Sequence, residues 1–435
     1  MKKSTIFAAT MLILLAMVSC SRAEMETTEL QGDDATMKPQ ASARFIKAMQ
    51  TARDAAGLLD GEPATRSEQE RQIDESEVKY IVADNATRSE SESDTLMYVF
   101  NYMDNAGFAV VSAVGESGEM LAVTEQGHFS SMEEIENEGF RIFMEAATVY
   151  TDSLRLAKEE ATRFDPPTGP GFIDDFMIIT DSVIVANCPP LVSVRWDQWQ
   201  PYNMFCPSLC SAGCVPVAIG QILSVYEFPT SFTLTYESNT PTININWNTL
   251  KNQSSCTSCS YWTFCADHVH IAQIIRQIGE DSRVSYSPQE SGTTFFRARE
   301  TLYQYGYTSD YSEDYNFNSV KTSLSNGRPL FMRGYLPNDE GGHTWVVDGC
   351  REVRYTYYSY SKPHGSPNSA WILEGINTET SRLNHINWGW KGDSNGYFAD
   401  GCFNTRHGAY DTGCSHYANF DFTYDFRILP NIRRQ

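Results

Sequence analysis

The chain has 435 residues, of which 41% are hydrophobic and 12% aromatic, enough to bury a full core and, at this length, two domains. Charged residues make up only 20% of the chain, which excludes a disordered or coiled-coil protein. The formal net charge of −22 argues against nucleic acid as the main partner.

The negative charge is concentrated in the front half of the chain. Residues 21–186 carry 33 acidic and 13 basic side chains, a net charge of −20. Residues 187–435 carry 22 acidic and 18 basic side chains, a net charge of −4, and Lys2 and Lys3 add +2. This asymmetry predicts two units with different roles.

The N-terminus has the features of a secretory signal peptide. Lys2 and Lys3 precede an apolar run over residues 6–18, which is too short to span a bilayer as a mature helix. Cys20 follows this run directly, as in a bacterial lipoprotein box, and is predicted to be lipidated. Cleavage by a general signal peptidase is the alternative. We therefore expect export from a bacterial cell, with the mature protein an outer-membrane lipoprotein, at the cell surface, in the periplasm or secreted after processing.

The next part of the chain predicts a polar linker followed by a small β-structure. Residues 21–95 are polar and acidic and are interpreted as a linker. The apolar segments 95–101 and 108–113 flank the turn residues 104–107, which is typical of a β-hairpin. Residues 120–123 predict a third strand.

A helix and a chain breaker are expected to close the front half. Ser131 and Glu134 form a capping-box pattern that predicts a helix from there to about Thr162. The Pro- and Gly-rich segment 166–171 then interrupts regular structure. We place the boundary between the two units near this breaker, at about residue 185.

The back half predicts one buried helix followed by strands. Residues 214–226 are apolar almost all round and end before Pro229, which indicates a buried helix. Two further helices are expected, at residues 293–305 and 319–325. Three strands are expected: one at 329–334, one at 343–347 that is closed by Asp348-Gly349, and one that ends near Asn387. This order is an α+β pattern.

Cys214 and His343 are the candidate catalytic residues. Cys214 lies where the buried helix begins, and the field of a helix N-terminus stabilises a thiolate. His343 follows two glycines and opens a strand, so its imidazole can hold the thiolate as an ion pair and then protonate a leaving amine. Taken singly, a buried structural cysteine and a structural histidine are the alternatives.

The back half resembles the streptopain family, secreted bacterial cysteine peptidases with a papain-like fold. The matching motifs occur in the family's order and cover about residues 190–430. They are Trp196-x-Gln198-x-x-Pro-Tyr-Asn203, Ala-Gly-Cys214-Val with Tyr226-x-x-Pro229, Asn326-Gly-Arg-Pro329, Gly-Gly-His343 with Val-Val-Asp-Gly349, and Ile-Asn387-Trp-Gly-Trp390 before Gly396-Tyr-Phe398. The front half resembles the family's propeptide through Tyr98-Val-Phe-Asn101 and Gly107-Phe-Ala-Val-Val-Ser-Ala113.

The resemblance implies a role for each motif residue. Cys214 corresponds to the nucleophile and His343 to the general base and acid. Gln198 corresponds to the donor that stabilises the oxyanion, with Gln200 as the rival. Asn387 would orient His343, and Trp388 would cover that contact from water. The alternatives are a turn role for Asn387 and a core role for Trp388.

Two features depart from the family pattern. Pro216-Val217-Ala218 follows Cys214-Val where relatives usually carry Ala-Thr-Ala, which changes the first helical turn. Cys206 and Cys210 lie just upstream of Cys214, and a disulfide there would mask the nucleophile.

The other cysteines allow disulfides or a metal site. In an exported chain, nine cysteines are disulfide candidates: Cys188, Cys206, Cys210, Cys256, Cys259, Cys265, Cys350, Cys402 and Cys414. Cys256, Cys259 and Cys265, with His268 and His270, have a spacing that allows a zinc site. A disulfide among these cysteines is the stronger alternative. We expect no metal and no cofactor.

The sequence as a whole predicts an exported cysteine endopeptidase made as a zymogen. Its expected fold is α+β, with a papain-like peptidase unit preceded by an α+β propeptide. The expected divisions are a signal peptide at 1–20, an acidic linker and inhibitory propeptide at 21–185, and the catalytic domain at 186–435. Its expected partners are protein or peptide substrates, its own propeptide and, through lipidated Cys20, a membrane. The alternative is an inactive lipid-anchored binding or inhibitory protein of the same fold.

Overall fold

The protein is described by a computed structural model, which places the following residues: 42–60, 71–83, 94–114, 118–164, 175–252, 266–288, 291–336, 341–362, 369–403 and 424–435. The expected signal peptide, Cys20 and the breaker at 166–171 lie outside these residues. Within them, no helix is both long enough and apolar enough to cross a membrane.

The N-terminal unit, residues 42–164, is a helix-covered antiparallel sheet. Its elements are α1 (Ala43–Asp60), β1 (Ile73–Val82), β2 (Thr95–Tyr102), η2 (Met103–Asn105), β3 (Phe108–Ser112), β4 (Met120–Thr124) and α2 (Glu138–Phe164). The predicted hairpin is confirmed, because β2 and β3 pair from Met97–Ser112 to Asn101–Phe108. The strand predicted at 120–123 is confirmed as β4.

Two expectations for this unit were wrong. Residues 21–95, for which no regular element was predicted, contain both α1 and β1. Helix α2 begins at Glu138 rather than at Ser131, because Asn137 provides the N-terminal cap: its Oδ1 accepts a hydrogen bond from Phe140 N at 3.1 Å.

The C-terminal unit, residues 175–435, has a helical side built around α3. Helix α3 (Cys214–Tyr226) has the predicted bounds, and its residues from Val215 to Ser224 are all buried. Because the helix is apolar on every side, other helices cover it. The helices and short helical turns of this unit are η3 (Pro207–Leu209), α4 (Trp247–Asn252), α5 (Ala266–Asp281), α6 (Phe295–Gln304), α7 (Phe317–Ser325) and η6 (Asp400–Phe403).

The other side of the unit is an antiparallel sheet. Its strands are β5 (Asp175–Cys188), β9 (Glu313–Asp314), β10 (Leu330–Tyr335), β11 (Gly342–Lys362), β12 (Ile372–Asn387), β13 (Gly396–Ala399) and β14 (Arg427–Leu429). Two small separate sheets pair β6 (Ser231–Thr233) with β7 (Thr242–Asn244), and β8 (Tyr307–Thr308) with β15 (Arg433–Arg434).

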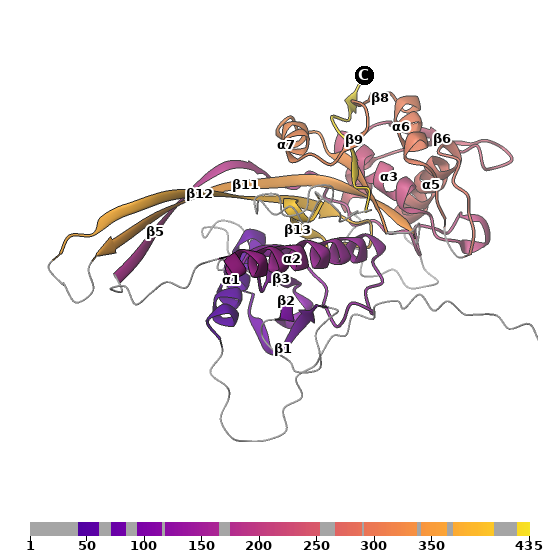
Figure 1. Cartoon of the computed structure of the whole chain (residues 1–435). Helices are drawn as coiled ribbons and strands as arrows, with labels where there is room; N and C mark the ends of the chain where they lie inside the picture. Colours follow the sequence, from indigo (N-terminus) through magenta and orange to yellow (C-terminus); the bar gives the residue numbers. More distant parts are fainter. Residues whose placement is uncertain are drawn as a thin grey trace, which may run out of the picture.

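The strand expected to end at Asp348-Gly349 continues to Lys362. The register of β11 and β12 shifts between Val347 and Gly349, so these residues form a bulge rather than a turn. Beyond the bulge, β5, β11 and β12 form a three-stranded ribbon that extends from the body of the molecule (Figure 1).

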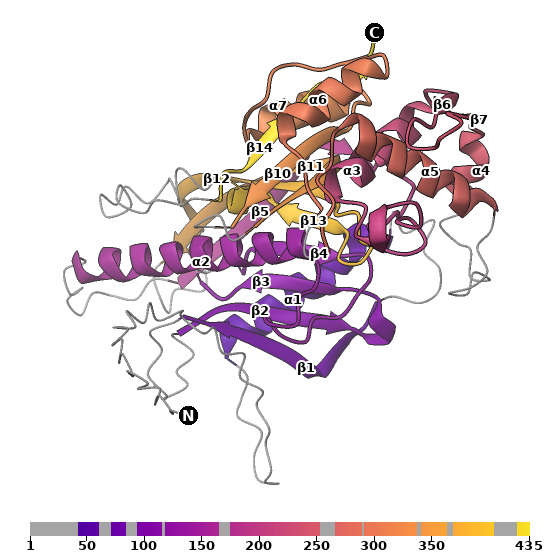
Figure 2. The same ribbon diagram turned by 90° about the vertical axis from the view of Figure 1, so that its right-hand side faces the viewer.

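One sheet runs through both units. Strand β4 pairs antiparallel with β13, from Gly396–Thr124 to Phe398–Ala122, and joins the two strand systems edge to edge. Helix α2 lies between the N-terminal sheet and the C-terminal unit (Figures 1 and 2). A single hydrophobic core extends from the N-terminal unit to Trp388, and a second core surrounds α3. The predicted α+β class is confirmed.

Candidate active site

Cys214 is the first residue of α3 and points toward the sheet side of the unit. Gly213 before it has φ 87°, a conformation that glycine adopts without strain, and a Cβ there would lie 3.0 Å from the carbonyl oxygen of Ser291. Burial acts to raise the pKa of Cys214, but the charge and hydrogen bonding of His343, and the backbone of Thr344, lower it below its ordinary value. The thiolate is therefore favoured at this position.

His343 is the second residue of β11 and is almost fully buried. Its Nε2 lies 3.1 Å from the carbonyl oxygen of Trp388 and donates to it, since a carbonyl can only accept. Burial acts to lower the pKa of His343, but the adjacent Cys214 and a carboxylate, Glu138, raise it to about 10. The pKa shifts of Cys214 and His343 therefore both favour the charged forms, a thiolate beside an imidazolium.

The structure places Asn387 differently from the sequence expectation. Its Oδ1 accepts from Gln221 Nε2 at 2.9 Å and from Gly389 N at 3.2 Å, and its Nδ2 donates to Val194 O at 2.9 Å. These bonds tie β12 to α3 and leave the amide engaged away from His343. The group that fixes the imidazole is the backbone carbonyl of the next residue.

Trp388 lies in the core beside His343, where both rings face Gly139. Its ring is 1% exposed and packs on Trp345 and Phe398, at centroid distances of 4.9 and 5.1 Å. Its Nε1 donates to Ser394 O at 2.9 Å, which fixes the ring plane. The ring is thus part of the core, and the backbone carbonyl of the same residue accepts the hydrogen bond from His343.

Gln198 lies in the same cavity as Cys214 and His343. The loop that carries it is held by Asp197, whose Oδ1 accepts from Gln198 N at 2.7 Å. The rival Gln200 is not among the residues that line this cavity. The geometry therefore favours Gln198 as the candidate oxyanion donor.

The departures noted in the sequence leave the helix intact. Pro216 lies in the first turn of α3 and is accommodated there. Cys206 and Cys210 are free thiols at either end of η3. Of the residues with zinc-site spacing, Cys256, Cys259 and Cys265 lie outside the described part of the chain.

The N-terminal unit reaches directly into this site, as expected of an inhibitory propeptide, through two residues that the sequence analysis did not single out. Glu138, the first residue of α2, has its Oε2 3.5 Å from His343 Nδ1. Gly139 is packed so closely that a Cβ there would lie 2.5 Å from the Trp388 ring and 2.7 Å from His343 Cδ2. Nothing local in the sequence marks these two residues, because their contacts depend on how the two units pack.

Comparisons with known proteins identify both units. A model of the peptidase C10 family matches residues 196–398, which include the Cys214–His343 pair. A model of the Spi protease inhibitor matches residues 43–150, which include the Glu138 and Gly139 contacts. These matches indicate a cysteine peptidase that is similar to the peptidase C10 family over its C-terminal unit and to a protease inhibitor over its N-terminal unit.

Individual proteins and one solved structure are also similar to this chain. Streptopain of Streptococcus pyogenes is 22% identical over 346 residues, covering 70% of this chain and 74% of the relative. The thiol protease/hemagglutinin PrtT of Porphyromonas gingivalis is 24% identical over 338 residues, covering 72% of this chain but 34% of the relative. A prointerpain A fragment of Prevotella intermedia is 20% identical, with a TM-score of 0.45, covering 78% of this chain and 94% of the fragment.

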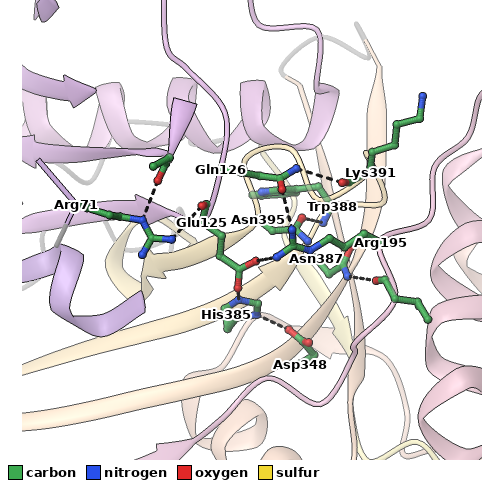
Figure 3. Close-up of polar contacts among 12 residues, drawn as sticks. Arg71, Glu125, Gln126, Arg195, Asp348, His385, Asn387, Trp388, Lys391 and Asn395 are labelled. Atoms are coloured by element: carbon green, nitrogen blue, oxygen red, sulfur yellow. Dashed lines mark hydrogen bonds and ion pairs between the residues drawn. The ribbon is translucent and has the colours of Figure 1, made fainter. Parts of the chain in front are cut away.

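A second polar contact joins the inhibitor domain to the peptidase, around Glu125 and His385 (Figure 3). Glu125 Oε1 lies 3.1 Å from His385 Nε2, and Glu125 Oε2 accepts from Arg195 at 2.8 Å. His385 Nδ1 is 2.6 Å from Asp348 Oδ1. Burial acts to lower the pKa of His385, but Asp348 and Glu125 raise it to about 9, so the imidazolium links a carboxylate from each unit.

Proposed function

We propose that this chain is an exported zymogen that hydrolyses peptide bonds through an acyl-thioester on Cys214. The thiolate adds to the carbonyl carbon of the substrate, and Gln198 donates a hydrogen bond to the oxyanion that forms. His343 gives its proton to the leaving amine as the C–N bond breaks. It then takes a proton from the water that hydrolyses the thioester, which restores the ion pair.

The single observation that carries this proposal is the pairing of Cys214 with His343 at the N-terminus of α3. Burial alone would raise the thiol pKa and lower the imidazole pKa, and both pKa values are shifted the opposite way. Such mutual stabilisation is what a nucleophilic cysteine needs, and it has no evident use in a purely structural pair.

Latency follows from the position of the inhibitor domain. Glu138 and Gly139 occupy the side of His343 that faces the cleft, where a substrate chain would have to lie. Because Glu138 stabilises the imidazolium, it also opposes transfer of the proton to a leaving group. The inactive binding protein is disfavoured, because nothing in such a protein requires an ion pair of this kind.

The proposed divisions are a signal peptide at 1–20, a linker and propeptide from 21, and the catalytic domain after it. The chain is exported and attached to lipid through Cys20. The sequence placed the last boundary at 185. Pairing of β5 with β11 over residues 175–188 favours a cut earlier than that, within residues 165–174, so that β5 stays with the peptidase.

Purified residues 21–435 would test this function as wild type and as Cys214→Ala, each with and without reductant. Gel electrophoresis and mass spectrometry follow the products over time. The expected result is cleavage at 165–174 in the reduced wild type alone. If neither protein is cut, the inhibitor domain is trimmed by an added protease and the product is treated with a thiol-directed active-site probe. An unreactive Cys214 in the trimmed protein would support the inactive binding protein instead.

A further inference from the structure

Two cysteines away from the catalytic centre lie directly opposite each other on neighbouring antiparallel strands. Cys188 is the last residue of β5, and the strand register pairs it with Cys350 of β11. Opposed residues of an antiparallel pair have Cα atoms about 4.5 or 5.5 Å apart. A disulfide spans Cα distances of about 4.4 to 6.8 Å, so directly opposed residues are within reach of one.

The two side chains already contact each other as thiols. Cys350 is fully buried, whereas Cys188 is partly exposed and has its Sγ 3.6 Å from Ser325 Oγ. Burial, together with the charge and hydrogen bonding of Cys188, raises the pKa of Cys350 to about 12. Among the described cysteines, these are the only two that are register partners in a sheet.

We propose that Cys188 and Cys350 form a disulfide that fixes β5 to the peptidase sheet. The accessible Cys188 thiolate attacks an external disulfide, such as oxidised glutathione, and forms a mixed disulfide with release of one glutathione thiolate. Cys350 then loses its proton and attacks the Cys188 sulfur, which releases the second glutathione. Overall, two protein thiols lose two protons and two electrons, and one glutathione disulfide is reduced.

The bond matters because β5 connects the inhibitor domain to the peptidase. Just after Cys188, Leu191 N and Val192 N donate to the backbone and side chain of Asp348, so the chain stays along β11 beyond the strand. A covalent link at this point retains β5 after the inhibitor domain is removed, and the three-stranded ribbon remains part of the mature enzyme. Formation of this disulfide in the cell rests on the export proposed above, because a reducing cytoplasm would keep both cysteines as thiols.

The test uses the full chain carrying Cys214→Ala, which prevents self-cleavage. The protein is oxidised in a glutathione buffer, free thiols are blocked with N-ethylmaleimide at mildly acidic pH, and the protein is digested with trypsin without reduction. By sequence, trypsin gives the peptides 164–195 and 334–351, and each contains one cysteine. The expected product is a single linked species of these two peptides that disappears on addition of dithiothreitol.

Matched variants identify the partners. Cys350→Ser is expected to leave Cys188 open to N-ethylmaleimide, whereas Cys402→Ala, at another buried cysteine, is expected to retain the linked species. Full labelling of both peptides after oxidation, or a link from Cys188 to any other peptide, would overturn the proposal. If Cys350→Ser does not fold, the digest of the Cys214→Ala protein alone decides. None of these readouts depends on export or on peptidase activity.

Discussion

Glu138 of the inhibitor domain faces His343 of the peptidase, with 3.5 Å between the carboxylate Oε2 and the imidazole Nδ1. Hydrogen bonding to His343 lowers the pKa of Glu138, so the carboxylate is charged at neutral pH. The precursor therefore keeps its catalytic ion pair assembled and adds a third charge to it. The inhibitor domain therefore blocks a catalytic site that is already assembled.

Glu138→Gln is expected to make the precursor more reactive. Removing the carboxylate lowers the pKa of His343 and weakens docking of α2. Because Glu138 is half exposed, the loss of docking free energy is about 0.5–1 kcal/mol. Labelling of Cys214 in the full-length band by a thiol probe should be roughly two- to five-fold faster. Glu133→Gln, at an exposed carboxylate just before α2, should label at the wild-type rate, and equal rates for all three proteins would contradict the role of Glu138.

Gly139→Ala is expected to displace the start of α2 from the cleft. Alanine favours a helix more than glycine does, but the added Cβ would lie within 3 Å of the Trp388 and His343 rings. Overpacking of this kind typically costs about 1–3 kcal/mol, so self-processing should be at least several-fold faster. Gly375→Ala, where a Cβ meets open space, is the control. Slower processing of Gly139→Ala than of the control would show that the contact is not inhibitory.

The stability of the precursor is expected to depend on pH through Glu125 and His385. The pKa of His385 is raised to about 9, so its contribution is complete below about pH 6.5 and is lost as the pH rises through about 9. Hydrogen bonding to His385 lowers the pKa of Glu125, whose contribution is complete above about pH 4.5 and is lost in stronger acid. The contact is therefore strongest between about pH 4.5 and 6.5.

Thermal unfolding of the full-length Cys214→Ala protein across this range would check the pH dependence. Adding Glu125→Gln should lower the midpoint most at pH 5–6, with a smaller difference below pH 4 and above about pH 9. His128→Gln, which removes an exposed histidine paired with Glu77, serves as the control. A difference that stays constant with pH would mean that Glu125 acts only through packing.

Gln198→Ala is expected to reduce catalysis without unfolding the enzyme. Loss of one oxyanion donor typically lowers kcat about 100- to 1,000-fold, with little change in KM. Gln200→Ala, at the neighbouring glutamine outside the cavity, should retain kcat within a few-fold. Comparison of kcat and KM for the two processed variants on a fluorogenic peptide decides between them, and the opposite order would assign the role to Gln200.

Asn387→Ala is expected to act on stability rather than on the orientation of His343. The change leaves Gln221 and Val194 with unpaired polar groups in the interior, which costs about 1–3 kcal/mol for each group. The melting temperature should fall, while kcat per titrated active site should stay within about ten-fold of wild type. A kcat loss of several orders of magnitude with an unchanged melting temperature would restore the predicted orienting role.

The parts of the fold that the sequence predicted are those specified locally. Helix α3 was predicted with its correct bounds because its apolar run has a proline near each end. The β2–β3 hairpin was predicted because two apolar strands flank a turn-forming segment. By contrast, Asp348-Gly349 was taken for a turn, since a bulge inside a long strand uses the same residues and is distinguished only by the strand beside it.

The site was predictable where one motif carries the chemistry and not where tertiary packing does. Cys214, His343 and Gln198 come from ordered motifs, and they line one cavity. The contact of His343 with the carbonyl of Trp388 involves a backbone atom, which no side-chain motif reveals. Glu138 and Gly139 belong to the other unit, and their significance appears only when α2 is packed against β11.

The pairing of β4 with β13 means that the precursor has no free strand edge where its two units meet. Separation of the units exposes two unsatisfied backbone edges at once, one on the released inhibitor domain and one on the peptidase. The same main-chain bonds can re-form between them, so cutting the connecting chain does not by itself make activation permanent. Activation becomes irreversible only when the released domain is diluted or degraded. The rate of its degradation then sets how long the newly cut enzyme stays inhibited.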